Sequence, residues 1–375
     1  MNAPELLDLK AICAQIQRPD ETAREAARDR HARLVKPAGS LGRLEDLSIW
    51  LAGVQGQSPT LPLRRVRVLV FVADHGVASL GVSAFHPEVT AQMLRTLLAG
   101  GAAVNAIARV TGAEVRVVDV GVDTDSAQDA DLPPEVTRYK VRRGSGRIDV
   151  EDALTHAEAE QAFRAGIALA DEEVDAGADL LVTGDMGIGN TTPAAAIIGV
   201  LSRLDAAEVI GRGSGIDDDT WMRKCAAIRD AMRRGRPAAA DPVKLLATTG
   251  GADFAAMTGL LLQAAVRRTP VVLDGVMSAA CALVAHRICF RAADWWLAGH
   301  RSPEPAHKIV LERLSLEPIL SLGLRLGEGT GGLIAVPLLQ AAAAIHAEMS
   351  TFDEAGVSEP PRETVPDETH EEAQS

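Results

Sequence analysis

Aromatic residues are scarce in this 375-residue chain, which has four Trp, one Tyr and six Phe. Proteins that bind single-stranded nucleic acids usually stack the bases on aromatic side chains, so the composition disfavours that class. The net charge of −13 argues further against a nucleic-acid partner, because a phosphate backbone requires a basic surface. No apolar run reaches the roughly 18 residues of a membrane span, and the N-terminus lacks a signal-peptide pattern. We therefore expect a cytoplasmic protein that contacts neither nucleic acid nor membrane.

Cysteine is also rare, and the spacing of Cys13, Cys225, Cys281 and Cys289 is not that of a metal site. Three of the four lie in apolar or helical surroundings, as buried free thiols usually do. We expect neither a metal nor a cofactor.

The negative charge is concentrated at the C-terminus. Residues 353–375 contain eight acidic residues and one basic residue, which is −7 of the total charge of −13. Because the segment also contains three prolines and few aliphatic residues, we predict a disordered, solvated tail. The rest of the chain is only mildly acidic.

What the chain does contain is glycine and aliphatic residues, with 33 Gly and a hydrophobic fraction of 47%. This composition suits a buried parallel sheet covered by helices. We predict five strands, each followed by a loop with an acidic residue beside glycine: residues 66–73, 115–118, 180–182, 270–273 and 322–326. Helical patterns lie between them, for example over residues 89–98, 156–175, 194–201 and 252–266.

Alternating strands and helices predict an α/β fold with a doubly wound, mostly parallel sheet. Ligands of such sheets bind at the carboxyl ends of the strands, where the five acidic loops are expected to meet. We place the large α/β domain at residues 61–332. Residues 1–60, where Ser40 is a candidate cap for a helix ending at Leu51, and a helix at 333–352 are expected to form a small helical subdomain.

The segment 180–193 is the most informative one, because an apolar strand leads through a glycine loop into a helix. Gly187 and Gly189 allow a close approach of the backbone, and a helix N-terminus favours an anion such as phosphate. Asp185 and the hydroxyl of Thr191 add polar groups, and Thr191 is also a candidate helix cap. Taken alone, the pattern fits an empty strand-to-helix turn equally well.

Glu328 is the first candidate for chemistry, because Gly327 and Gly329 flank it after the last predicted strand. A flat apolar substrate that shields this carboxylate from water would raise its pKa and make it a better base. The alternative is a glutamate that caps the following helix.

Other loops allow similar interpretations. Gly213 and Ser214 belong to a second glycine-rich loop, and Lys224 on the next helix could supply a positive charge to a phosphate held there. A flexible loop with Asp217 as the helix cap explains the same sequence equally well. Gly251 begins another helix. The histidines in the loops at 74–76 and 299–307 are better explained as hydrogen-bonded structural residues than as metal ligands.

These segments together resemble a known family. The motifs occur in the order Lys36-Pro37-x-Gly39-Ser40-Leu41-Gly42, Ala73-Asp74-His75-Gly76-Val77, Val89-Thr90-Ala91-Gln92-Met93, Gly187-Ile188-Gly189-Asn190-Thr191-Thr192, Gly211-Arg212-Gly213, Gly250-Gly251-Ala252-Asp253, Gly299-His300-Arg301-Ser302 and Gly327-Glu328-Gly329. Over roughly residues 30–350 the chain resembles the nicotinate-nucleotide–dimethylbenzimidazole phosphoribosyltransferases of cobalamin biosynthesis.

The resemblance implies a homodimer with a large Rossmann-like domain and a small helical one. It also implies phosphoribosyl transfer from nicotinate mononucleotide to 5,6-dimethylbenzimidazole, without a metal. Glu328 is then the general base, and Asp185 or Lys224 is a secondary acid or a ribose contact. Nucleotide contacts are expected at Gly187, Gly189, Asn190, Thr191, Gly213, Ser214, Gly251 and Gly327, and base contacts at Phe85, Gln92 and Met186.

The chain departs from the family pattern at Asp185, where the family usually has glutamate, and at Phe85-His86-Pro87. A nucleotide-binding regulatory protein with a degenerate active site is therefore one alternative. A NAD-dependent dehydrogenase is another, but no clean Gly-x-Gly-x-x-Gly follows a first strand.

Overall fold

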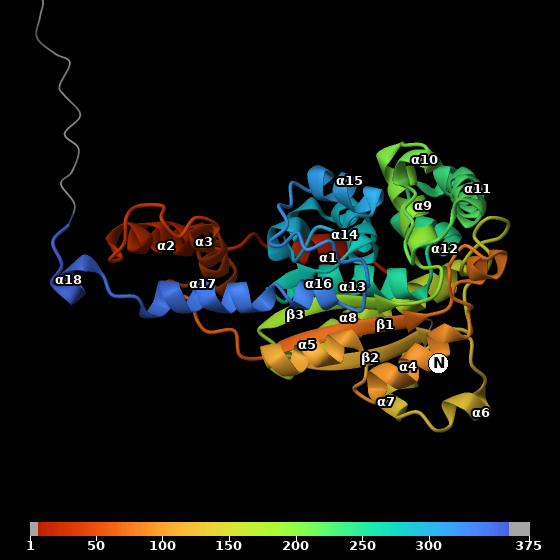
Figure 1. The fold of residues 1–375 in the computed structure, drawn as a ribbon, viewed down its shortest axis with the longest axis horizontal. Helices are drawn as coiled ribbons and strands as arrows, with labels where there is room; N and C mark the ends of the chain where they lie inside the picture. The colour runs from red at the N-terminus through yellow and green to blue at the C-terminus, as the bar shows by residue number, and fades with distance from the viewer. Residues whose placement is uncertain (1–6, 360–375) are drawn as a thin grey trace, which may run out of the picture.

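The fold is built on one parallel sheet of five strands, seen in a computed structural model that describes residues 7–359 (Figure 1). The strands lie in the order β2-β1-β3-β4-β5, and every neighbouring pair is parallel. Their bounds are β1 Val66–Ala73, β2 Glu114–Gly121, β3 Leu180–Met186, β4 Val271–Leu273 and β5 Trp296–Ala298. The predicted α/β doubly wound fold is confirmed.

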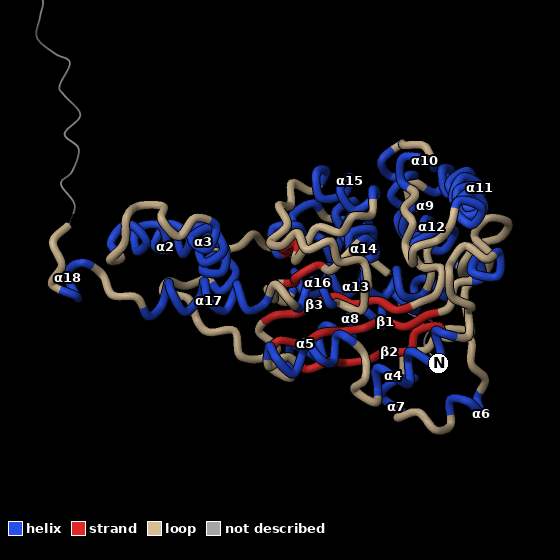
Figure 2. The backbone as a smooth tube through the Cα atoms, viewed as in Figure 1, coloured by secondary structure: helices blue, strands red, loops and turns tan. Residues whose placement is uncertain are grey.

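Helices surround the sheet (Figure 2). Those of eight residues or more are α2 Glu21–Arg33, α3 Arg43–Gln55, α4 Val89–Leu98, α5 Ala103–Thr111, α8 His156–Asp175, α9 Thr191–Ser202, α11 Asp218–Gly235, α12 Pro242–Thr249, α13 Ala252–Val266, α14 Val276–Ile288, α15 Pro305–Arg313 and α17 Val336–Glu348. The shorter ones are α1 Leu9–Gln15, α6 Ser126–Asp129, α7 Pro134–Thr137, α10 Ala206–Val209, α16 Thr330–Leu333 and α18 Phe352–Ala355. Short 3₁₀ segments lie at Gly76–Leu80, Arg236–Ala238 and Phe290–Trp295.

Two groups of helices cover the two faces of the sheet. α13 packs on β1 and β2, with α14 beside it on β3, while α4, α5 and α16 pack against the strands from the other side. α8 crosses α13 closely, because a Cβ at Gly166 would lie 1.7 Å from the carbonyl oxygen of Ala256. Local sequence also fixes the start of α8, where Thr155 and Glu158 form a reciprocal capping box.

The strand order places a switch point between β1 and β3, where successive connections leave in opposite directions. Ligands of doubly wound sheets bind beside such a point, outside the carboxyl ends of the strands. The loops after β1 and β3 are in contact there, since a Cβ at Gly187 would lie 2.2 Å from the carbonyl oxygen of Ala73.

α2, α3 and α17 pack on one another at the end of the molecule remote from this switch point (Figure 1). The guanidinium of Arg30 donates to the carbonyls of His346, Ala347 and Met349 at the end of α17, which a cation stabilises. These helices come from both ends of the chain. The domain boundaries given above remain a prediction.

Two predicted elements are wrong. Residues 322–326 form no strand, and the fifth strand is instead the three-residue β5. Ser40 does not cap a helix, because Gly42 is the N-cap residue of α3. The helices predicted at 89–98, 156–175 and 252–266 have the bounds of α4, α8 and α13.

The cysteines and the tail also differ from expectation. Cys13 and Cys289 form a disulfide that joins the segment of α1 to the end of α14, whereas Cys225 and Cys281 are free. Residues 353–355 belong to α18, which Thr351 and Glu354 cap reciprocally, so the predicted disorder is wrong there. Residues 360–375 lie outside the described part of the chain.

One helical stretch of the described residues, Thr330–Glu348, is long and apolar enough by length and composition alone to cross a membrane. It comprises α16 and α17, and 56% of its apolar window is buried inside the protein. α16 packs on β3, β4 and α5, and α17 packs on α2 and α3, so the apolar residues of this stretch belong to the protein core.

Candidate functional site

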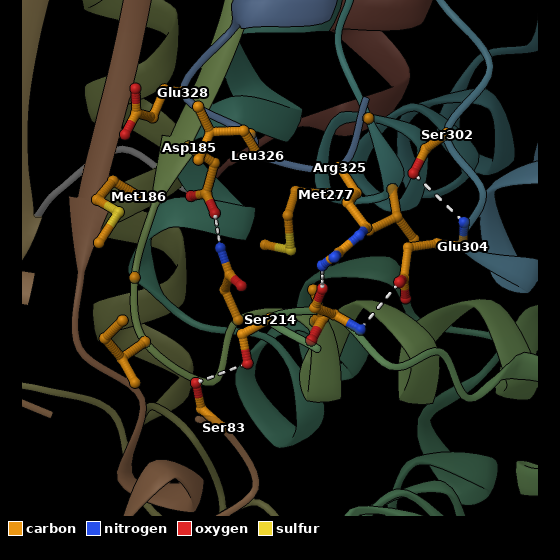
Figure 3. Close-up of a pocket in the computed structure, with 18 of the residues that line it drawn as sticks. Ser83, Asp185, Met186, Ser214, Met277, Ser302, Glu304, Arg325, Leu326 and Glu328 are labelled. Carbon is orange, nitrogen blue, oxygen red and sulfur yellow. Dashed lines mark hydrogen bonds between the residues drawn. The ribbon is translucent and has the colours of Figure 1, made fainter. Parts of the chain in front are cut away.

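A cavity of about 590 Å³ opens at the carboxyl ends of β3, β4 and β5. Its walls come from the loops that follow these strands and from residues 82–93, 213–214 and 323–328. Figure 3 shows Glu328 and Met186 at one side of the cavity and Ser302 and Glu304 at the other. The two sides differ in chemistry.

The glycine loop after β3 forms the floor between them. Gly189 has φ +90°, and Asn190 is the N-cap residue of α9, so Thr191 begins the helix and does not cap it as predicted. Asn190 donates its side-chain N–H to Asp185 at 2.7 Å, and the hydroxyl of Thr90 accepts the N–H of Ile188 at 3.1 Å. These hydrogen bonds fix the loop that leads into α9, and residues 187–191 line the cavity.

Lys224 supplies a buried positive charge beside this helix start. Its ammonium donates to the hydroxyl of Thr191 at 2.7 Å and to the carbonyl of Gly211 at 3.3 Å. Burial lowers the pKa of Lys224 to about 8, although the nearby carboxylate of Glu304 acts in the opposite direction. A cation at a helix N-terminus forms an anion site.

The loop at 211–215 closes this side of the cavity. Glu304 accepts the N–H of Gly213 at 2.9 Å, and Arg325 donates to the carbonyl of Gly213. A Cβ at Gly213 would lie 3.2 Å from both the ammonium of Lys224 and the hydroxyl of Thr191, so only glycine leaves this corner open. Ser214 accepts the N–H of Ala84 at 3.0 Å and thereby holds the 82–85 segment.

The opposite side of the cavity is apolar. Val89, Met93, Met186 and Leu326 line it, together with Phe85, a residue that is 56% exposed. This composition fits a flat apolar ligand that carries few polar groups.

Glu328 lies among these apolar groups with φ +62°, between Gly327 at +88° and Gly329 at +87°. Its N–H donates to the carbonyl of Asp185 at 3.0 Å. Its carboxyl is buried, and Oε2 has no partner. Burial raises the pKa of Glu328, while the backbone N–H of Val104 opposes the shift and the charge of Asp274 adds to it. Glu328 does not cap α16, because Asp274 accepts the N–H groups at the start of that helix.

Asp185 belongs to a buried acidic pair that sequence reasoning missed. Burial raises the pKa of Asp185 well above its ordinary value, and the adjacent carboxyl of Asp253 raises it further. His75 Nε2 lies 3.0 Å from Asp253 Oδ2. Burial lowers the pKa of His75, but Asp253 more than offsets this, so the pKa is raised overall. The His-Gly and Gly-Gly-Ala-Asp motifs thus meet behind the cavity wall.

Two candidate residues lie away from the cavity. Gly251 packs against His75 and Asp253, since a Cβ there would be 2.6 Å from Asp253 Oδ1. Gln92 is exposed, and its neighbour Met93 lines the cavity instead. The other twelve candidate residues all line it.

Sequence reasoning also passed over Glu304, Ser302, Met277 and Arg325, which line the cavity. Arg325 was placed in a strand that does not form. Asp274 is one of the five acidic residues predicted at strand ends. Its position directly after β4 is the sequence signal for the hydrogen bonds that it accepts from residues 329–332. Among residues 7–359, no group of three or more His, Cys, Asp or Glu side chains is arranged to hold a metal.

Comparison with known proteins identifies the family. A phosphoribosyltransferase family model matches residues 16–357. The chain is 55% identical over 347 residues to the nicotinate-nucleotide–dimethylbenzimidazole phosphoribosyltransferase of Mycobacterium avium (strain 104), covering 92% of this chain and 98% of the relative. The chain belongs to this phosphoribosyltransferase family. The resemblance inferred from the motifs is thereby confirmed.

Two further nicotinate-nucleotide–dimethylbenzimidazole phosphoribosyltransferases are similar to this chain and support the same family assignment. The enzyme of that name from Streptomyces avermitilis is 56% identical over 344 residues, with 92% of this chain and 91% of the relative covered. A crystal structure of the phosphoribosyltransferase from Thermus thermophilus superposes with a TM-score of 0.84 at 41% identity, covering 91% of this chain and 100% of the other. The protein is therefore an enzyme, a phosphoribosyltransferase of this type.

Proposed function

We propose that the enzyme transfers the phosphoribosyl group of nicotinate mononucleotide to 5,6-dimethylbenzimidazole. The products are α-ribazole 5′-phosphate and nicotinate, formed with inversion at C1′. Glu328 acts as the general base.

The observation that carries the proposal is the division of one cavity into two chemically different sides. Lys224, Thr191 and the glycine corner at Gly213 suit a phosphate. Met186, Val89 and Leu326 suit a flat apolar base, with the Glu328 carboxyl among them. A phosphoribosyl donor and an apolar acceptor would meet between the two sides.

The bonds and charges balance with a single base. A ring nitrogen of dimethylbenzimidazole attacks C1′, and the proton of its other nitrogen passes to the carboxylate of Glu328. The bond from C1′ to the pyridinium nitrogen breaks, and its electron pair neutralises that ring. Because the leaving group departs without taking up a proton, no general acid is needed.

Inversion follows if the acceptor attacks opposite the departing nicotinate. The transition state is expected to have oxocarbenium character, as at other glycosidic carbons. Holding the two substrates on either face of the ribose then supplies much of the acceleration. Asp185 and Asn190 lie on the cavity wall between the two sides and are proposed to contact the ribose.

A homodimer and a cytoplasmic location also remain predictions. Phe85, Leu322 and Leu326 are between 56% and 60% exposed near the cavity, which suits coverage by a second copy.

The function is tested by incubating the protein with nicotinate mononucleotide and a panel of benzimidazoles. We expect nicotinate and an α-ribazole phosphate to appear in equal amounts. A benzimidazole methylated on one ring nitrogen has no proton to give to Glu328 and is expected to be a poor acceptor. Binding of the nucleotide without release of nicotinate would contradict the proposal and favour the regulatory alternative.

Gly189→Val tests the nucleotide side. Valine is poorly suited to φ +90°, and its Cβ would lie 3.2 Å from that of Ala78. We expect the loop to shift in order to relieve this strain, which costs about 1–3 kcal/mol, and KM for nicotinate mononucleotide to rise roughly 10- to 100-fold because the shifted N–H groups no longer face the phosphate. Gly112→Val is the matched control, because Gly112 has φ +71° with open space around it and does not line the cavity. An unchanged KM in Gly189→Val would assign the phosphate to another loop.

A further inference from the structure

Asp274, the residue after β4, binds the segment that carries Glu328. Its Oδ2 accepts the N–H of Gly329 at 3.1 Å, and its Oδ1 accepts those of Gly331 and Gly332 at 2.7 and 3.0 Å. The side chain is buried, with 3% of the residue exposed. One carboxylate thus satisfies three donors within four residues of Glu328.

The backbone at Glu328 requires such support. A residue other than glycine at φ +62° occupies a sparsely populated conformation, which persists only where the surroundings fix it. The N–H of Glu328 is held by the carbonyl of Asp185 on one side. Asp274 holds the following N–H, that of Gly329, on the other.

Close packing leaves this segment little room to move toward the sheet. A Cβ at Gly331 would lie 2.0 Å from the ring of His300, and one at Gly332 would lie 2.8 Å from Val182. A Cβ at Gly299 would lie 2.5 Å from the Cα of Gly332. The glycines bring the segment within reach of Asp274, and its hydrogen bonds then fix the segment in place.

We propose that Asp274 is a positioning residue that fixes the backbone under Glu328 and places a negative charge beside its carboxyl. The inference rests on the proposed function, since it takes Glu328 as the base. Asp274 acts through Glu328 and takes no proton itself.

The charge of Asp274 matters because it changes the pH range in which the Glu328 carboxyl is deprotonated and can act as a base. Burial raises the pKa of Glu328, the N–H of Val104 lowers it, and the charge of Asp274 raises it. The other titratable groups on the elements packed around the segment are Asp185 on β3, Arg109 on α5 and His300 after β5. Removal of the Asp274 charge alone should therefore lower the pKa of Glu328.

Asp274→Asn separates the two effects. Asparagine keeps one oxygen for Gly331 and Gly332 but presents an NH₂ group to the N–H of Gly329. We expect kcat to fall roughly 100-fold, as for a small displacement of a catalytic group. We also expect the acidic limb of the pH–rate profile to move to lower pH. A normal kcat, or a fall in kcat with an unmoved limb, would overturn the proposal.

Asp119→Asn is the matched control. Asp119 is also a buried acid near a strand end, and its Oδ1 accepts the N–H groups of Gly121 and Val122 at 3.0 and 2.8 Å. It does not line the cavity, so its replacement should leave the acidic limb in place. If Asp274→Asn fails to fold in a thermal melt, Asp274→Ser removes the same charge and is judged by the same criteria.

A second readout does not depend on turnover. The Glu328 carboxyl can be titrated by infrared difference spectroscopy between each protein and the same protein with Glu328→Gln. Its pKa should be lower in Asp274→Asn than in the original chain, and an equal or higher value would contradict the proposal. If the original chain releases no nicotinate, the proposed function fails while this titration still decides the role of Asp274.

Discussion

Glu328→Gln is expected to reduce kcat by about 10²- to 10⁴-fold, the usual contribution of a general base. Glutamine has the same shape, so its side-chain oxygen can still accept the N–H of Val104, which acts on Glu328 in the original chain. It cannot accept a proton from the acceptor base. The affinity for nicotinate mononucleotide should stay unchanged, because Glu328 lies at the side of the cavity away from Glu304 and the proposed phosphate site at Gly213.

The pH dependence of activity provides a second test of the role of Glu328, and the direction of the change can be predicted. Burial raises the pKa of Glu328 above that of an ordinary glutamate. The charged form, which is the proposed base, is therefore lost as the pH falls through this raised value. As the pH is lowered, the original chain should lose activity at a higher pH than it would if Glu328 were an exposed glutamate. Glu328→Gln should not show this acidic loss of activity.

Glu173→Gln is the control for removal of a buried carboxylate. Glu173 forms ion pairs with Arg67 and Arg116 and does not line the cavity. Its replacement should lower the melting temperature and leave kcat in place. A near-normal kcat in Glu328→Gln would contradict the assignment of the base.

The sheet was largely predictable because its strands are apolar runs that end at acid and glycine. β1 has the predicted bounds for this reason, with every residue of the strand except Arg67 buried. Residues 322–326 show the same kind of pattern for a different cause. Leu322 and Leu326 are about 60% exposed and lie near or in the cavity wall, so their apolar character is not that of a buried strand. β4 and β5 are both three residues long, but only β4, with the sequence Val-Val-Leu, has the β-branched run that predicts a strand; β5 is Trp-Leu-Ala.

The residues that line the cavity were predictable only where a single motif contains them. Glu328 and the 187–191 loop could be selected as candidates because glycine and a polar residue are adjacent in the sequence, and the structure places them at the cavity. The Asp185–Asp253–His75 group joins three separate motifs, so only the fold brings it together. The disulfide between Cys13 and Cys289 likewise spans 276 residues, a separation at which sequence gives no information on distance. α18 is different, because its Thr-x-x-Glu capping box was present to be found.

Lys224→Met is expected to have the second large effect, on the affinity for the nucleotide. A hydrogen bond to a charged group contributes about 1.5–3 kcal/mol, which corresponds to a rise in KM of roughly 10- to 150-fold. The loss should exceed the lower limit, because the carboxylate of Glu304 would remain near the phosphate without the cation that faces it. The additional replacement Glu304→Gln removes this repulsion and should recover part of the affinity, as a double-mutant cycle would measure.

The pH dependence separates a phosphate contact from a structural role of Lys224. Burial lowers its pKa to about 8, so the free enzyme loses this positive charge as the pH rises through that value. In the original chain KM for nicotinate mononucleotide should therefore rise above about pH 8, and in Lys224→Met this rise should be absent. Lys140→Met is the matched control, because Lys140 is a largely buried lysine whose partners, Asp119 and Asp129, lie outside the cavity. If Lys140→Met and Lys224→Met changed KM equally, the phosphate would not be bound by Lys224.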